Sequence, residues 1–149
     1  MSIPRPEYPR PQMVREKWIN LNGKWDFDFD FGKSGKDRGL FKTDVKLSKE
    51  IIIPFCPESP LSGINYKDFI AAVWYKKDVE IPKDWKGKRV ILHFGAADFR
   101  TEVWINGNSV GTHEGGYTSF SFDITKFVVP GINNIAVCCE DDTRSGDQP

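Results

Sequence analysis

The segment from Arg89 to Thr125 limits the possible folds of this chain more than any other. It contains successive short runs in which apolar and polar residues alternate, such as the run that includes Val90, Leu92 and Phe94. Side chains of a β-strand point to opposite faces in turn, so this period of two predicts half-buried strands. Asn106-Gly107 lies between two of these runs and suits a tight turn in which both central residues have positive φ. The segment predicts antiparallel hairpins and an all-β fold.

The rest of the chain continues the same pattern. From Trp25 to Phe31, aromatic residues alternate with Asp26, Asp28 and Asp30, which predicts a strand with one buried aromatic face and one acidic face. We interpret the acidic face as solvated, because carboxylates along one side of a strand do not converge as calcium ligands do. Further strands are predicted at 45–53, 73–81 and 134–141.

The connections between these strands are polar and rich in turn-forming residues. Gly32 to Gly39 reads as a polar loop, and Pro54 to Asp68 reads as a long loop with local turns. A short helical turn is expected around Pro82 to Trp85. Many short strands and no sustained helix predict an antiparallel two-sheet β-sandwich. The pattern alone leaves both the immunoglobulin topology and the jelly roll open.

The size and charge of the chain restrict its class. A chain of 149 residues predicts a single domain that is large enough for a core without disulfides or metals. Lys and Arg balance Asp and Glu at 21 each, so no basic excess points to nucleic acid or to a membrane surface. We therefore expect neither nucleic acid nor membrane as a partner.

The three cysteines carry no metal or redox motif. Cys138 and Cys139 are neighbours whose side chains would point to opposite faces of a strand, and no Cys-x-x-Cys or Cys/His metal spacing occurs. We interpret them as small buried apolar residues in a reducing compartment. The first 15 residues are rich in proline and charge, which does not fit a signal peptide, so the cytoplasm is the expected location.

No arrangement of residues predicts catalysis within this chain. The only histidines are His93 and His113, and no Gly-x-Ser-x-Gly motif accompanies them. His93 is expected to be a packed or edge residue of a strand, and the glycines around His113 suggest a tight bend. No catalytic residue, metal site or cofactor is expected.

Several short motifs in a fixed order resemble one enzyme family. They are Trp18-Ile19-Asn20-Leu21-Asn22-Gly23-Lys24-Trp25, Ile53-Pro54-Phe55, Val73-Trp74-Tyr75-Lys76-Lys77, Ile81-Pro82, His93-Phe94-Gly95-Ala96-Ala97-Asp98, Val103-Trp104-Ile105-Asn106-Gly107, Gly111-Thr112-His113-Glu114-Gly115-Gly116-Tyr117 and Gly131-Ile132-Asn133-Asn134. No single motif is diagnostic, but their order and spacing are specific. The chain resembles the N-terminal sugar-binding domain of glycoside hydrolase family 2, which holds β-galactosidases, β-glucuronidases and β-mannosidases.

The resemblance implies a jelly roll of the galactose-binding kind and a larger parent enzyme. In that family, both catalytic glutamates come from a downstream β/α barrel, and nothing in this chain has a barrel's repeating pattern. The expected organisation is a proline-rich arm at 1–22, a β-sandwich at 23–142 and a polar tail at 143–149 that leads to absent downstream domains. The expected partner is carbohydrate, bound together with the parent's barrel, and the parent would be a retaining β-glycosidase.

The candidate substrate contacts lie in the tail and in the long loop. The tail resembles the family segment that runs near the substrate pocket, so Asp147 and Gln148 are the first candidates, followed by Asn65 and Tyr66. Of the five tryptophans, Trp25 is expected in the core. Trp85 is the one expected to be exposed, either to stack on a sugar or simply to cap the sandwich.

Three functions remain open from the sequence. The chain is a non-catalytic sugar-binding or scaffold domain of a family 2 enzyme, an autonomous carbohydrate-binding module, or a purely structural module that packs against the rest of its own chain. An exposed aromatic surface would favour the second function, and an apolar patch beside the tail would favour the third.

Overall fold

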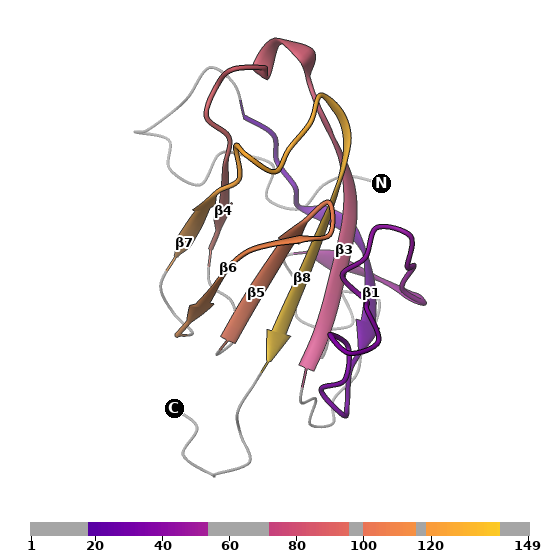
Figure 1. The fold of residues 1–149 in the computed structure, drawn as a ribbon. Helices are drawn as coiled ribbons and strands as arrows, with labels where there is room; N and C mark the ends of the chain where they lie inside the picture. The colour runs from indigo at the N-terminus through magenta and orange to yellow at the C-terminus, as the bar shows by residue number, and fades with distance from the viewer. Residues whose placement is uncertain (1–17, 54–71, 96–99, 116–118, 141–149) are drawn as a thin grey trace. The chain divides into compact units, whose positions relative to one another are not determined.

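The fold consists of antiparallel strands in two sheets, as the sequence predicts. The computed structural model describes residues 18–53, 72–95, 100–115 and 119–140. In this part of the chain the strands are β1 (Gly23–Phe29), β2 (Lys49–Ile53), β3 (Ala72–Ile81), β4 (Ile91–Phe94), β5 (Arg100–Ile105), β6 (Asn108–Glu114), β7 (Phe120–Asp123) and β8 (Gly131–Glu140). One sheet has the order β2-β1-β3-β8-β5-β6, and β4 pairs with β7 in the second (Figure 1).

The chain divides into two compact units. The smaller comprises Met1–Trp25 and Glu50–Asp68, and the larger comprises Asp26–Lys49 and Phe69–Pro149. In the smaller unit, Lys24 Nζ lies 3.5 Å from Glu50 Oε1 on the surface. The strap and the candidate site described below belong to the larger unit. No helix among the described residues is long and apolar enough to cross a membrane.

β8 is the central strand of the larger unit. All ten of its residues pair with β3, from Ala72 with Glu140 to Ile81 with Gly131, and its second edge pairs with β5 from Arg100 to Ile105. β8 begins three residues earlier than the sequence predicts. The turn that leads into β8 is held by the side chain of Asn133. Its oxygen accepts from the Val129 N–H at 2.8 Å, and its NH2 group donates to the Val129 carbonyl at 2.7 Å.

The predicted hairpin at Asn106-Gly107 is present. Both residues have positive φ, 52° and 84°, as a type I′ turn requires, and they connect β5 to β6. The side chain of Asn106 also donates to the Phe127 carbonyl at 3.0 Å and to Asn133 Oδ1 at 2.8 Å. The turn is therefore tied both to Phe127, before β8, and to Asn133, near the start of β8.

The centre of the larger sheet is buried on both faces. One face carries Phe27, Thr101, Val103 and Ile105, all of which are fully buried. The opposite face, called the outer face here, carries Trp74, Lys76, Glu102, Trp104 and Cys138, which the β3, β8 and β5 registers place side by side. Cys138 and Cys139 therefore point to opposite faces, as predicted, and both are buried.

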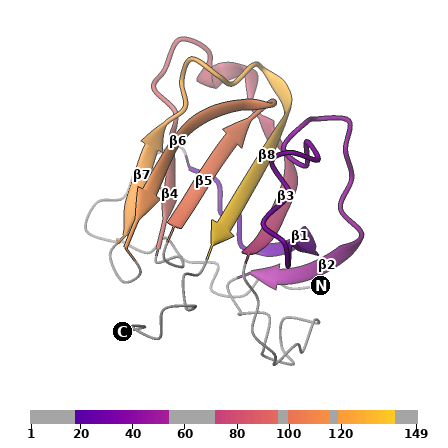
Figure 2. The same ribbon diagram turned by 60° about the horizontal axis from the view of Figure 1, so that its bottom comes forward.

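Residues 30–47 form a segment, called the strap here, that covers the outer face (Figure 2). Leu40 and Leu47 of the strap are buried in a cluster with Trp74 and Trp104, whose rings stack at 4.9 Å. The prediction of a strand from residue 45 is wrong at its start, because β2 begins at Lys49 and the chain before it belongs to the strap.

Other local predictions had mixed outcomes. Trp25 is buried, and a short 3₁₀ helix, η3 (Lys83–Trp85), is present where a helical turn is predicted. Trp85 is only partly exposed, whereas Trp18 is 37% exposed, so the prediction that singled out Trp85 is wrong. His93 is an exposed residue of β4. His113 lies within β6 and stacks on Phe120 at 3.9 Å, so the chain continues as a strand up to Glu114. The rest of the segment predicted to bend includes residues 116–118, which lie outside the described residues.

Candidate functional site

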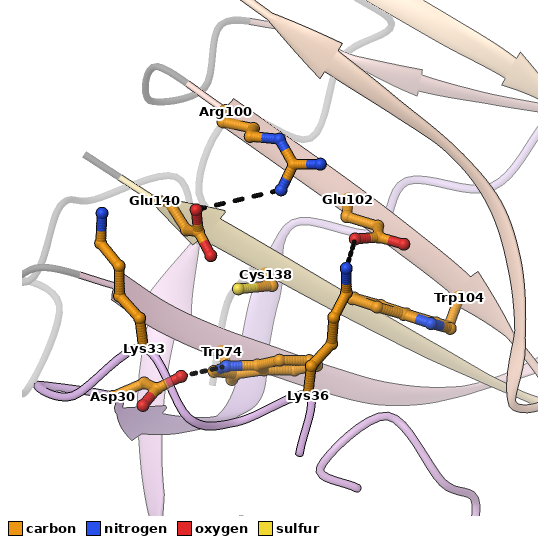
Figure 3. Close-up of a pocket in the computed structure, with 9 residues that line it drawn as sticks. All are labelled: Asp30, Lys33, Lys36, Trp74, Arg100, Glu102, Trp104, Cys138 and Glu140. Carbon is orange, nitrogen blue, oxygen red and sulfur yellow. Dashed lines mark hydrogen bonds and ion pairs between the residues drawn. The ribbon is translucent and has the colours of Figure 1, made fainter. Parts of the chain in front are cut away.

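The candidate site is a hollow on the outer face of the larger sheet, between the strap and the ends of β3, β5 and β8 (Figure 3). It has a volume of about 50 Å³. It is lined by three cations, three carboxylates and three less polar side chains, namely Lys33, Lys36, Arg100, Asp30, Glu102, Glu140, Trp74, Trp104 and Cys138. A water molecule needs at least about 10–15 Å³. The hollow therefore has room for a few waters or for one polar edge of a larger molecule.

Asp30 organises the strap side of the hollow. It is 3% exposed, and its Oδ1 accepts the Ser34 N–H at 2.8 Å, while its Oδ2 accepts the Gly35 N–H at 2.7 Å. Oδ2 also accepts the indole N–H of Trp74 at 3.1 Å. The expectation that Asp30 belongs to a solvated acidic face is wrong. β1 ends at Phe29. The hydrogen bonds that the Asp30 side chain accepts from Ser34 and Gly35 then hold the turn at the start of the strap.

The close approach between the strap and β3 depends on Gly35. A Cβ atom at this position would lie 2.2 Å from Trp74 Nε1 and 2.7 Å from Asp30 Oδ2. Any side chain here would push the strap off the tryptophan. Glycine at position 35 is therefore required for the Asp30 hydrogen bonds.

The Asp30 carboxyl is ionised at neutral pH. Burial alone would raise its pKa, but hydrogen bonds from Ser34, Gly35 and Trp74 and the charge of Arg38 hold the pKa below its usual value. Arg38 NH2 lies 3.4 Å from Asp30 Oδ1. Asp30 therefore has no proton to donate, and a general acid for glycoside cleavage would need the opposite shift.

The other two carboxylates face cations. Glu102 Oε1 lies 3.0 Å from Lys36 Nζ, and Glu102 Oε2 accepts from the Ser109 hydroxyl at 3.0 Å. Glu140 Oε1 lies 3.9 Å from Arg100 NH1. At the base of the hollow, burial raises the pKa of the Cys138 thiol, so it is no thiolate nucleophile. The arrangement suits binding of polar groups and offers no acid–nucleophile pair.

The strap is fixed at its far end by a buried lysine. Lys76 is 3% exposed, and its ammonium donates to the carbonyls of Lys42 at 2.6 Å and Val45. Burial lowers the pKa of Lys76, and the nearby charges of Asp78, Asp44 and Asp26 oppose that shift. Asp30 and Lys76 together hold the strap over the tryptophans.

The structure does not bear on the residues that the sequence singles out for substrate contact. Asp147, Gln148, Asn65 and Tyr66 lie outside the described residues. Conversely, the sequence pattern does not single out Lys33, Arg100 or Glu140, which line the hollow. One signal was available for the strap: Asp30 stands at the end of a strand pattern and is followed by Ser34-Gly35, which suits a carboxylate that accepts backbone N–H groups.

Comparison with known proteins places the chain in a family. Residues 18–145 match the profile described as glycosyl hydrolases family 2, sugar binding domain. The chain is 32% identical over 133 residues to a β-glucuronidase of Felis catus, covering 83% of this chain and 20% of the relative. It is 36% identical over 127 residues to a β-galactosidase of Thermoanaerobacter pseudethanolicus, covering 85% of this chain and 17% of the relative.

Solved structures agree with the sequence relatives. A β-glucuronidase from Ruminococcus gnavus in complex with a C6-substituted uronic isofagomine superposes with a TM-score of 0.73 at 27% identity. The alignment covers 81% of this chain and 21% of that one, so the chain spans about a fifth of the length of the proteins it matches. The profile covers nearly the whole chain, and the chain therefore belongs to glycosyl hydrolase family 2, as its sugar-binding domain.

Proposed function

We propose that the chain serves as the non-catalytic, sugar-binding and scaffolding domain of a larger glycoside hydrolase. The observation that carries this proposal is the family match over residues 18–145, combined with relatives about five times longer than the chain. Of the three relatives named above, two are β-glucuronidases and one is a β-galactosidase. The parent is accordingly proposed to cleave a terminal β-glycosidic bond, with its two catalytic glutamates in a downstream barrel.

The charges of the described residues support a non-catalytic role. Retaining glycoside hydrolysis uses a protonated carboxyl and a second, nucleophilic carboxylate about 5–5.5 Å away. Asp30 is held ionised by its donors, and Glu102 is paired with Lys36. The rings of Trp74 and Trp104 are also unavailable for stacking on a sugar, since both are buried beneath the strap. That burial argues against a sugar-stacking surface on this face, and hence against the autonomous module.

The direct test is an assay of the chain and of the full-length parent on p-nitrophenyl β-glucuronide and β-galactoside. We expect no turnover by the 149-residue chain and turnover of one of the two substrates by the parent. Hydrolysis by the isolated chain that persists after repurification would contradict the proposal.

We further propose that Asp147 and Gln148 contact the substrate at the rim of the parent's active site, with Asn65 and Tyr66 as secondary contacts. Loss of one hydrogen bond to a charged group costs about 1.5–3 kcal/mol. The Asp147→Asn parent should therefore lose on the order of tenfold to a hundredfold in kcat/KM. Asp37→Asn, on the exposed surface of the strap, is the matched control and should leave kcat/KM unchanged.

The same proposal covers domain organisation and location. Residues 1–22 would form an extended arm, and residues 143–149 would lead into the downstream domains. Cys138 and Cys139 are buried free thiols, which supports a reducing compartment such as the cytoplasm. Cell fractionation with an antibody to the parent would test the location.

A further inference from the structure

Lys33 has a backbone conformation that a lysine rarely adopts. Its φ is 53°, and among the described residues only Asn106 shares a positive φ without being glycine. Asn106 is explained by its hairpin and by its amide hydrogen bonds. Glycine or asparagine would suit position 33 better than lysine as far as the backbone is concerned. The lysine side chain therefore requires an explanation of its own.

The ammonium of Lys33 lines the hollow without a partner in the described part of the chain. No described residue forms a hydrogen bond or an ion pair with it, whereas Lys36 on the same strap lies 3.0 Å from Glu102. Arg100 is also only loosely engaged. Its nitrogens lie 3.7 Å from Glu114 and 3.9 Å from Glu140, which is too long for hydrogen bonds. Two cations at one side of the hollow thus retain donors.

Glu140 provides the acceptor between them. Figure 3 shows its carboxylate between the ammonium of Lys33 and the guanidinium of Arg100. Its side chain is 30% exposed, and the 3.9 Å contact with Arg100 is its one ion pair among the described residues. The three side chains therefore present a donor, an acceptor and a donor in turn.

That order fits two neighbouring hydroxyl groups. Each hydroxyl can accept one hydrogen bond and donate another, so each can accept from one cation and donate to one oxygen of Glu140. We propose that Lys33, Glu140 and Arg100 bind the vicinal diol edge of a sugar ring at this hollow. The inference deepens the proposed sugar-binding function and rests on it, because it assigns that function to a place on the outer face.

Charge and size favour a neutral diol over an anionic group. The hollow is lined by three cations and three carboxylates, and the central Glu140 would repel a carboxylate or phosphate placed between Lys33 and Arg100. About 50 Å³ accommodates the two hydroxyls while the ring stays at the surface. Binding of this shallow kind should be millimolar.

The test is an NMR titration of the isotope-labelled 149-residue chain, with the indole N–H of Trp74 as the reporter. This group lines the hollow and donates to Asp30, so it should respond to a ligand there. The probes are methyl β-galactoside, methyl β-glucuronide and tetrahydropyran-2-methanol, which lacks a ring diol. We expect saturable shifts of the indole with both glycosides, at similar millimolar affinity, and none with the third probe.

Two substitutions at Lys33 separate binding from folding. Lys33→Met should weaken the binding of both glycosides by at least about tenfold, which is the loss expected for a charge-assisted hydrogen bond. Lys33→Gly should weaken glycoside binding equally. The midpoint of its thermal unfolding should stay the same or rise, because glycine adopts the positive φ without strain. Lys46→Met, an exposed strap lysine outside the hollow, is the matched control and should bind like the wild type.

Three results would overturn the inference: an indole that does not move, a shift that survives Lys33→Met, or glucuronide binding more than tenfold tighter than galactoside, which would assign the site to a carboxylate. None of these results affects the glycosidase assay of the parent. Failure of the hollow and failure of the proposed function are therefore distinguishable.

Discussion

Replacing Asp30 by asparagine should destabilise the fold substantially although the two side chains have nearly the same shape. Both carboxylate oxygens of Asp30 accept hydrogen bonds: Oδ1 from Ser34 and Arg38, and Oδ2 from Gly35 and Trp74. Asparagine keeps one acceptor oxygen and turns an NH2 group toward the other pair of donors. At least one donor pair therefore loses its acceptor.

The magnitude follows from the less costly orientation of the amide. If the asparagine oxygen faces Gly35 and Trp74, the N–H of Ser34 loses a charged acceptor, which costs about 1.5–3 kcal/mol. The ion pair with the half-exposed Arg38 adds about 0–1 kcal/mol. The free energy of unfolding should thus fall by about 1.5–4 kcal/mol, which lowers Tm by on the order of 10 °C for a chain of this size.

The effect should depend on pH with a definite sign. The pKa of Asp30 is lower in the folded chain than in the unfolded one, so the carboxylate contributes its stability above about pH 4. That contribution is lost as the pH falls through the folded pKa. The difference in the free energy of unfolding between the wild type and Asp30→Asn should therefore be largest at pH 7 and shrink toward about pH 2.

Urea denaturation followed by tryptophan fluorescence at pH 7 and at pH 3 measures both effects. Asp37→Asn, on the exposed side of the same strap, is the control and should stay within about 0.5 kcal/mol of the wild type. The reasoning is refuted if Asp30→Asn also stays within that range at pH 7, or if its deficit grows as the pH falls.

Two further outcomes are expected from buried groups. Lys76→Met removes the donor to the Lys42 and Val45 carbonyls and should lower stability by about 1–3 kcal/mol, with faster amide exchange in the strap. Because burial lowers the folded pKa of Lys76, the wild type should gain stability as the pH rises through that pKa, and urea titrations should show no such gain in the variant. In a Cys56→Ser background, a thiol reagent should label neither Cys138 nor Cys139 in the native chain and should label both in denaturant; mass spectrometry showing native labelling would contradict their burial.

The sequence predicted the strands better than it predicted what covers them. Alternation and the Asn106-Gly107 turn located β4 to β8, because these signals depend on neighbours along the chain. The same alternation extended β1 to Asp30 and Phe31, yet the chain leaves the sheet after Phe29 and Phe31 is 56% exposed. The competing cause is the bond between Asp30 and Trp74, which lie 44 residues apart. Local pattern carries no information about such a contact.

The candidate site was harder to predict for the same reason. Pattern left open which way Trp74 and Tyr75 point, and it could not show that the strap lies across the outer face. Lys33 of the strap lines the hollow together with Arg100 of β5 and Glu140 of β8, two paired strands that lie far from the strap in the sequence. The family was recognised because its motifs are spread along the whole chain, whereas this constellation becomes visible only when the chain is folded.

The position of β8 has a consequence for the order of folding. It is the last described strand in the sequence, yet it separates β3 from β5 and pairs with both. Until residues 131–140 leave the ribosome, β1 with β3 and β5 with β6 can form only two separate ladders, each with an unpaired edge. During synthesis the two ladders therefore stay unjoined until β8 is available. The strand that joins them also carries Glu140, which lines the hollow. Closure of the larger sheet and completion of the hollow are in this way one event.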